Sequence, residues 1–283
     1  MLSNLFSLMR AHQWYKNTVI FIAIFFTGNL LNLDAFSNVT IGFITLCIIS
    51  SSNYVINDIF DVKEDRIHPE KKKRALASGK INKTTAIIFA LILFAVGIFL
   101  ADTLGNMFLI SVVLLFILTL LYSMGLKNEP FLDIILIGVF FVIRAVSGAL
   151  ILNVSISPWL IICAFFLAIY IAIGKRYADI MFLGKDAIKH KKVLKYYTID
   201  ILNIMLATSL STIIICYTLY TFIKVDQKLI ITIPIIAYGL FRYLLLIKTE
   251  SIVSRHPEKA LLDLKLMGAI VLWGTIIFMF FYT

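Results

Sequence analysis

The chain is poor in charge. Asp, Glu, Lys and Arg make up 15% of its 283 residues, against about a quarter in soluble domains. This scarcity excludes an ordinary water-soluble domain, and a hydrophobic content of 61% indicates an integral membrane protein. Acids are the scarcer sign, 16 against 26 bases, giving a formal net charge of +10. In a membrane protein such an excess reports topology, so we expect no nucleic-acid partner.

Cysteine and proline are also scarce. Cys47, Cys163 and Cys216 each stand alone in an apolar stretch with no nearby His, which excludes a disulfide framework or a zinc site. The five prolines form no linker, and no short repeat is visible, so the sequence predicts one domain over residues 1–283. The first apolar stretch lacks a small-residue cleavage pattern, and we expect no signal peptide.

Long apolar runs dominate instead. A bilayer core of about 30 Å requires about 20 apolar residues per helix, and such runs must be helical because backbone polar groups in lipid satisfy one another. The sequence therefore predicts an all-α bundle of about nine transmembrane helices, with polar loops capping an active site. The predicted spans are residues 16–33, 40–56, 84–101, 107–124, 130–151, 158–174, 199–223, 229–247 and 264–282.

The positions of Lys and Arg predict the orientation. With a cytoplasmic N-terminus, almost all of them fall in loops after even-numbered helices, whereas Lys224 and Lys228 lie in an outward loop. This is the positive-inside pattern. The three long polar segments, residues 58–83, 175–197 and 248–265, would then all face the cytoplasm.

The first of these segments begins with a cluster of acids. If the helix continues past the membrane edge, 100° per residue places Asp58, Asp61 and Asp65 on one face, and Asn57 lies near it. Mg²⁺ prefers such oxygen ligands. A solvated acidic helix end is the alternative, but four bases follow at residues 71–74. Acids beside bases at a membrane edge favour a magnesium-diphosphate site.

The second segment repeats this combination. A continued helix would align Lys175, Asp179 and Asp186, and Lys175 and Arg176 could bind phosphate. Asp179 could bind a second metal or a sugar hydroxyl. The alternative is a positive-inside anchor with salt-bridged neighbours. The run from His190 to Lys192 has the character of surface charge or of a segment attracted to anionic lipid headgroups.

For two further features, the run of residues 10–17 and Arg144, the sequence allows either a structural or a functional role. The run Arg10-Ala11-His12-Gln13-Trp14-Tyr15-Lys16-Asn17 could anchor the first helix at the interface or belong to the site. Arg144 lies inside a predicted span, where an ionised side chain is costly, and favours a polar cavity or an ion pair, for instance with Asp133. A transporter would require more ionisable residues at this depth.

Several motifs along the chain form one set: Asn57-Asp58-x-x-Asp61-x-x-x-Asp65, Gln13-Trp14-x-Lys16-Asn17, Asp65-Arg66-x-His68-Pro69 through Arg74 and Ser78-Gly79, Tyr122-Ser123, Leu126-Lys127, Lys175-Arg176 and Phe241-Arg242-Tyr243. Taken together, these motifs resemble the UbiA superfamily of intramembrane prenyltransferases, and in particular its polyprenyl-phosphate phosphoribosyltransferase branch. The resemblance covers nearly the whole chain, although Arg10-Ala11 and Arg74-Ala75 stand where the family usually has Arg-Pro, and Asp179 often corresponds to Glu.

The resemblance implies transfer of 5-phosphoribose from 5-phosphoribosyl 1-diphosphate to a long-chain polyprenyl phosphate, with Mg²⁺ as cofactor, for lipid-linked pentose donors of cell-envelope glycans. A bacterial-type plasma membrane is implied, while homo-oligomerisation stays open. The alternative is prenyl transfer to an aromatic acceptor, for which an acid is expected where Leu183 stands. The implied catalytic residues are Asp58, Asp61, Asp65 and Asp179; the metal ligands Asn57, Asp58, Asp61 and Asp65; and the substrate-binding residues Gln13, Lys16, Asn17, Arg66, Lys72, Arg74, Tyr122, Lys127, Arg144, Lys175, Arg176 and Arg242.

Overall fold

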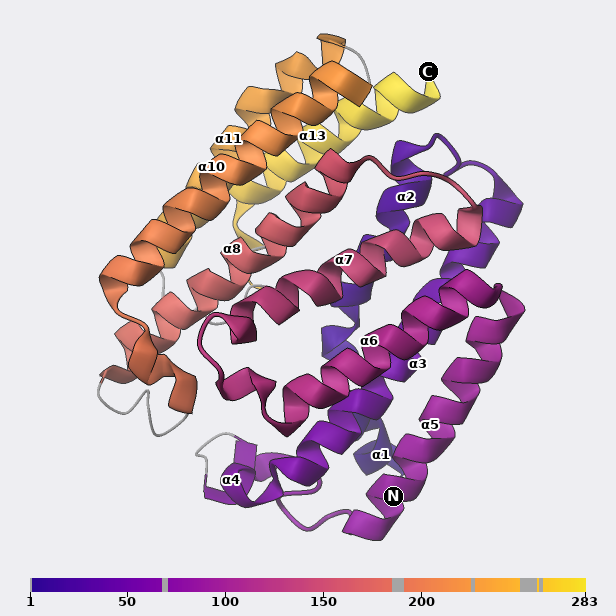
Figure 1. Cartoon of the computed structure of the whole chain (residues 1–283), viewed down its shortest axis with the longest axis vertical. Helices are drawn as coiled ribbons and strands as arrows, with labels where there is room; N and C mark the ends of the chain where they lie inside the picture. Colours follow the sequence, from indigo (N-terminus) through magenta and orange to yellow (C-terminus); the bar gives the residue numbers. More distant parts are fainter. Residues whose placement is uncertain (1, 68–70, 185–190, 225–226, 250–258, 260–261) are drawn as a thin grey trace. The chain divides into compact units, whose positions relative to one another are not determined.

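The computed structural model describes residues 2–67, 71–184, 191–224, 227–249, 259 and 262–283, and within these ranges it is helical without a strand (Figure 1). The predicted all-α class is confirmed. Eight helices in the described part of the chain are long and apolar enough to span a membrane. Seven are α3 (Leu33–Phe60), α5 (Lys83–Thr103), α6 (Asn106–Met124), α7 (Leu132–Leu152), α8 (Pro158–Leu183), α10 (Ile199–Lys224) and α13 (Leu264–Tyr282); in the eighth, η6 (Gln227–Thr232) leads into α11 (Ile233–Thr249).

The chain packs as two compact units. Unit 1 comprises Met1–Lys127 and Ile143–Ser155, and unit 2 comprises Asn128–Val142 and Ile156–Thr283. Helix α7 therefore contributes its first half to unit 2 and its second half to unit 1. The single domain over residues 1–283 stays a prediction.

The first predicted span differs from a regular helix. Residues 16–33 do not form one α-helix: after α1 (Leu2–Met9), a 3₁₀ helix η1 (Ala11–Ile20) leads into the short α2 (Phe21–Phe26), and α3 begins at Leu33. Hydropathy could not reveal this, because an apolar run is compatible with either helical geometry. The count of nine spans stays a prediction.

Small side chains explain how unit 1 packs. Helix α5 turns Ala86, Ala90, Gly97 and Ala101 inward, so that its backbone lies close to α3. A Cβ added at Gly97 would lie 2.6 Å from the side chain of Ile49 in α3. Ser52 of α3 also donates a hydrogen bond to the carbonyl of Ala90 (2.8 Å). Close approach of small residues and an interhelical hydrogen bond are typical of helix packing in membranes.

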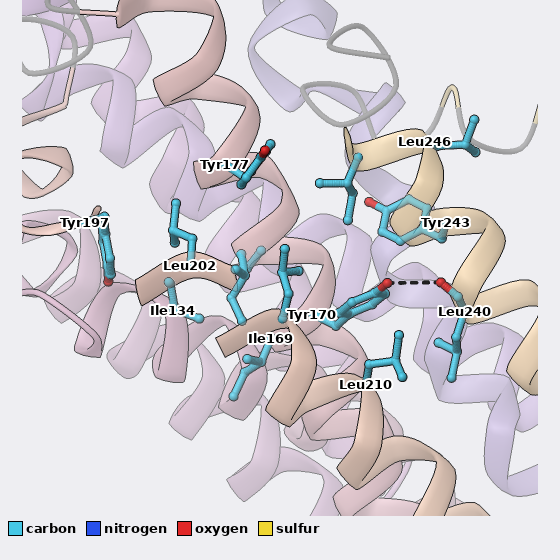
Figure 2. Close-up of a cluster of buried hydrophobic side chains, with 14 of the residues drawn as sticks. Ile134, Ile169, Tyr170, Tyr177, Tyr197, Leu202, Leu210, Leu240, Tyr243 and Leu246 are labelled. Carbon is cyan, nitrogen blue, oxygen red and sulfur yellow. Dashed lines mark hydrogen bonds between the residues drawn. The ribbon is translucent and has the colours of Figure 1, made fainter. Parts of the chain in front are cut away.

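Unit 2 is built around a core shared by α8, α10 and α11. The aromatic side chains of Tyr170 and Tyr243 meet edge to face within it, with ring centroids 5.7 Å apart (Figure 2). The Tyr170 hydroxyl, fully buried, donates to the Leu240 carbonyl at 3.0 Å. This bond ties α8 to α11 and satisfies a polar group that would otherwise be costly in the core.

Candidate active site

The acids of the first polar segment lie on both sides of a bend at the end of α3. The continued helix that their alignment assumed is interrupted at one point: α3 ends at Phe60, Asp61 is its C-cap, and α4 (Val62–Ile67) starts immediately afterwards. Hydrogen bonds continue across the bend, from the Asp61 amide to the Asn57 carbonyl (2.9 Å) and from the Asp65 amide to the Asp61 carbonyl (2.8 Å). Asp58 and Asp65 point inward and are buried, whereas Asp61 is half-buried.

Each of these acids meets a cation from elsewhere in unit 1. Arg74 donates through one nitrogen, Nη1, to Asp58 (3.1 Å) and to Asp65 (2.6 Å). Arg10 also pairs with Asp58. Lys127 pairs with Asp61 at 2.6 Å, and Asn57 donates to the same carboxylate at 3.0 Å. We call Asp58, Asp61, Asp65, Arg10, Arg74 and Lys127 the unit 1 charge cluster; it holds three acids and three bases.

Arg10 is held in the cluster by its own segment. It joins α1 to η1 in a left-handed conformation (φ 50°), and its guanidinium lies 5.3 Å from the ring centroid of Tyr54 in α3. Ser51 of α3 anchors both flanks, donating to the Met9 carbonyl (3.0 Å) and accepting from the Trp14 indole (3.1 Å). From the sequence, this segment could be either an interfacial anchor or part of the site. The one signal for a role of Arg10 in the site was its position at the predicted membrane interface.

The donor chemistry of the cluster suits a divalent cation at one point. Carboxylate oxygens of Asp58 and Asp65 lie within hydrogen-bond distance of the same Arg74 nitrogen, so the space between them already accommodates positive charge. Mg²⁺ commonly takes one or two carboxylates and completes its shell with phosphate and water. Asp61 is turned toward Lys127, and no group of three or more His, Cys, Asp or Glu is gathered for a metal in the described residues.

Two predicted substrate contacts form a buried pair in unit 1. The Nε atom of Arg144 donates to the amide oxygen of Asn17 at 2.7 Å, and both side chains are buried. The Asn17 amide in turn donates to the sulfur of Cys47 (3.3 Å). Arg144 belongs to unit 1 and Asp133 to unit 2, so the suggested ion pair between them stays a prediction. Gln13, Lys16 and Tyr122 are half-buried, whereas Arg66 and Lys72 are exposed.

In unit 2 a buried carboxylate organises the second motif. Asp133, in the first turn of α7, accepts hydrogen bonds from the Tyr197 hydroxyl (2.6 Å), from Nε of Arg176 (3.0 Å) and from Lys191 (3.0 Å). The Nη1 atom of Arg176 lies 4.0 Å from Asp179. We call these five residues the Asp133 cluster. It gathers α7, α8 and η5 (Lys192–Tyr196) with their flanking residues, and sequence reasoning missed Lys191 and Tyr197.

The remaining predicted residues of unit 2 have other surroundings. Lys175 is exposed, and Asp186 lies outside the described residues. Arg242 forms a two-bond ion pair with Asp263, at 3.1 and 2.7 Å. Asp263 also caps α13 by accepting from the Leu266 amide (2.8 Å). These two contacts lower the pKa of Asp263 to about 2, so it stays ionised. Arg242 therefore joins α11 to α13.

Comparison with known proteins places these clusters in a family context. The model of the UbiA prenyltransferase family matches residues 18–264. Decaprenyl-phosphate phosphoribosyltransferase of Mycolicibacterium smegmatis is 30% identical over 226 residues, which cover 78% of this chain and 71% of the relative. The protein of that name from Corynebacterium glutamicum is 30% identical over 218 residues, covering 76% and 66%.

Among solved structures, a UbiA homolog from Archaeoglobus fulgidus bound to GPP and Mg²⁺ is similar in fold. The TM-score is 0.73 at 17% identity, with 98% of this chain and 99% of the other covered.

Proposed function

This chain belongs to the UbiA prenyltransferase family, and on that premise we propose that it transfers 5-phosphoribose from 5-phosphoribosyl 1-diphosphate to a long-chain polyprenyl monophosphate. The observation that carries the proposal is the unit 1 charge cluster, because a metal-bound diphosphate needs carboxylates for the metal and cations for its oxygens. The choice of substrates is supported by the names of relatives that are 30% identical over most of the chain.

We assign the leaving diphosphate to the unit 1 charge cluster. Asp58 and Asp65 would hold Mg²⁺, and Asp61 and Asn57 would join the ligand set once Asp61 turns away from Lys127. When bound, Mg²⁺ would neutralise charge on the departing diphosphate. The bases that now balance the carboxylates, Arg74 above all, would then donate to diphosphate oxygens.

The transfer itself needs little proton chemistry. The bond between the anomeric carbon and the diphosphate oxygen breaks, the diphosphate keeps both electrons, and an oxygen of the lipid phosphate bonds to that carbon. This phosphate is already an anion at neutral pH, so a strong general base is unnecessary and positioning supplies much of the rate. Lys16, Lys175 and Arg176 are assigned to phosphate binding or its support, and Asp179 to a ribose hydroxyl.

The second candidate is prenyl transfer from a prenyl diphosphate to an aromatic acceptor. It is considered because the chain is similar in fold to a UbiA homolog bound to GPP. The sequence of the second motif argues against it, because Leu183 stands where an acid four residues after Asp179 would be expected.

One pair of assays separates the candidates. Purified protein with Mg²⁺ receives labelled 5-phosphoribosyl 1-diphosphate and polyprenyl phosphate, or a labelled prenyl diphosphate and an aromatic acid. We expect label to enter the lipid phase in the first reaction and no aromatic product in the second. Product formed in the second reaction alone would reverse the assignment.

A substitution tests the role of the acids. Asp61→Ala removes a carboxylate beside the proposed metal, and we expect turnover to fall at least ~100-fold, the scale of one lost electrostatic contact in a transition state. Asp34→Ala is the matched control, since Asp34 is an exposed acid in the first turn of the same helix and should leave activity unchanged. Near-normal turnover in purified, folded Asp61→Ala protein would refute the metal assignment.

A further inference from the structure

The members of the Asp133 cluster differ in whether a ligand can reach them. The side chains of Asp133 and Arg176 are 0% and 6% exposed, whereas those of Asp179 and Lys191 are 18% and 23% exposed. Sequence reasoning gave the opposite ranking, with Arg176 as a phosphate contact and Lys191 as surface charge. The two half-buried members, Asp179 and Lys191, carry opposite charges, and each contacts one residue of the buried pair.

The buried pair, Asp133 and Arg176, is suited to hold the other side chains of the cluster in place. The Nε atom of Arg176 has one hydrogen, which it donates to Asp133, so the plane and direction of the guanidinium are fixed. Its far side faces Asp179 at 4.0 Å. Asp133 is itself fixed by the Tyr197 hydroxyl, which also accepts a hydrogen bond from the Phe131 amide (2.7 Å). Arg176 is thus held between two carboxylates and shielded from solvent.

Lys191 has donor capacity that Asp133 does not use. Its ammonium carries three N–H groups, and one of them meets Asp133. Among the described residues, the groups that face it are Asp133 from α7, Arg176 and Asp179 from α8, and Tyr197, which binds the same carboxylate. Burial and the nearby Arg176 charge lower the pKa of Lys191 to about 7, although Asp133 and Asp179 act in the opposite direction. Another anion would therefore favour the charged form.

We propose that Lys191 binds a phosphate group of a substrate, with Asp133 and Arg176 acting as positioning residues beneath it. The inference rests on the proposed function in that the ligand is a phosphate-bearing substrate. It adds Lys191 as a binding residue in unit 2. It also changes the role of Arg176 from binding the phosphate to positioning the residues that bind it.

The chemistry gives a signature that a structural lysine would lack. Because unliganded Lys191 is largely neutral above pH 7, binding of a phosphate should take up a proton and should weaken by up to about tenfold per pH unit above that value. The phosphate contributes little to this change, since its second pKa is near 6 and it is already a dianion.

The experiment is calorimetric titration of the full-length protein in detergent, with Mg²⁺, at pH 8 in two buffers of different ionisation enthalpy. The titrants are 5-phosphoribosyl 1-diphosphate and, separately, a short-chain polyprenyl phosphate. With wild-type protein we expect proton uptake on binding one of them. Lys191→Arg should bind without uptake, because Arg stays charged, and Lys191→Met should bind roughly 10- to 100-fold more weakly.

Lys195→Met is the matched control. Lys195 is exposed in η5, where its ammonium lies over the Tyr196 ring at 4.6 Å, and its loss should change neither affinity nor uptake. Unchanged proton uptake in Lys191→Arg, or wild-type affinity in Lys191→Met, would overturn the proposal. If Lys191→Met fails to fold, Lys191→Arg alone decides through the uptake measurement.

A third titrant separates failure of this inference from failure of the proposed function. If wild-type protein binds neither substrate but binds geranylgeranyl diphosphate, the proposed transfer is wrong, and the Lys191 variants are then judged with that ligand. Loss of proton uptake there would still support Lys191 as a phosphate ligand. Binding of all three phosphates without uptake, or of none, would overturn it.

Discussion

At the scale of single residues, several buried polar side chains in this protein are hydrogen-bonded to one another. Asn17 illustrates the principle: its amide oxygen accepts from Arg144 while its nitrogen donates to Cys47. A buried donor left without its acceptor costs its full desolvation penalty, whereas removing both partners can cost little. Residues predicted from the sequence to bind substrate, such as Asn17 and Arg144, therefore also hold helices together.

This matching predicts a non-additive response to mutation. Asn17→Leu removes the acceptor of the buried Arg144 Nε–H, and we expect it to destabilise the protein by about 1–3 kcal/mol. The double variant with Arg144→Met removes both partners and should be less destabilised than the sum of the two single variants. Thermal unfolding in detergent measures the cycle; strict additivity would show that the hydrogen bond contributes nothing.

At the scale of elements, the 3₁₀ helix η1 is the unusual feature. It runs antiparallel to α3, because Arg10, Trp14 and Asn17 meet Asp58, Ser51 and Cys47 in reverse order. Three residues per turn place Trp14, Asn17 and Ile20 on one face. Because a 3₁₀ helix rises about 2.0 Å per residue, η1 covers a given length of α3 with fewer residues than α3 itself uses. With α2 the segment reaches ~29 Å, close to a bilayer core.

The end of this element requires a glycine on its neighbour. A Cβ at Gly148 of α7 would lie 2.0 Å from the Ile20 carbonyl oxygen, a backbone atom that cannot move independently. We expect Gly148→Ala to lower the unfolding temperature clearly, despite the gain of about 1 kcal/mol that Ala brings to a helix. Gly274→Ala in α13, where a Cβ meets nothing within 4 Å, is the control and should be neutral or stabilising. Equal behaviour of both variants would contradict the close approach.

At the scale of the whole molecule, charge distribution and hydropathy carry most of the information. The bases that surround the acids of unit 1 and those of the second motif belong to segments predicted on the same, cytoplasmic side. We propose that the protein lies in the plasma membrane with its N-terminus and both motifs inside.

Labelling of introduced cysteines tests the orientation. In a background without Cys47, Cys163 and Cys216, Lys228→Cys in η6 should react with a membrane-impermeant maleimide in right-side-out vesicles. Lys83→Cys at the start of α5 should react only after the membrane is opened. Both positions are exposed in the structure. The reverse pattern would invert the topology, and equal labelling from one side would contradict the assignment of the intervening spans.

The sequence by itself determined the all-α membrane class, the approximate bounds of the long helices and the position of both acidic motifs. These depend on local properties: hydropathy over about 20 residues and the spacing of acids along a chain. The bend at Asp61 and the 3₁₀ geometry of η1 escaped it, because the hydropathy of a run does not distinguish between helix types.

Only the tertiary structure decided which charges neutralise one another. Asp58 pairs with Arg10, which is 48 residues away in the sequence. Lys127 pairs with Asp61 at a separation of 66 residues, and Arg176 with Asp133 at a separation of 43. Nothing in the local sequence specifies such pairs, since they depend on which helix ends the packing brings together. Exposure is equally non-local: Arg176 is buried whereas Lys191 is partly exposed, the reverse of what their neighbours in sequence suggested.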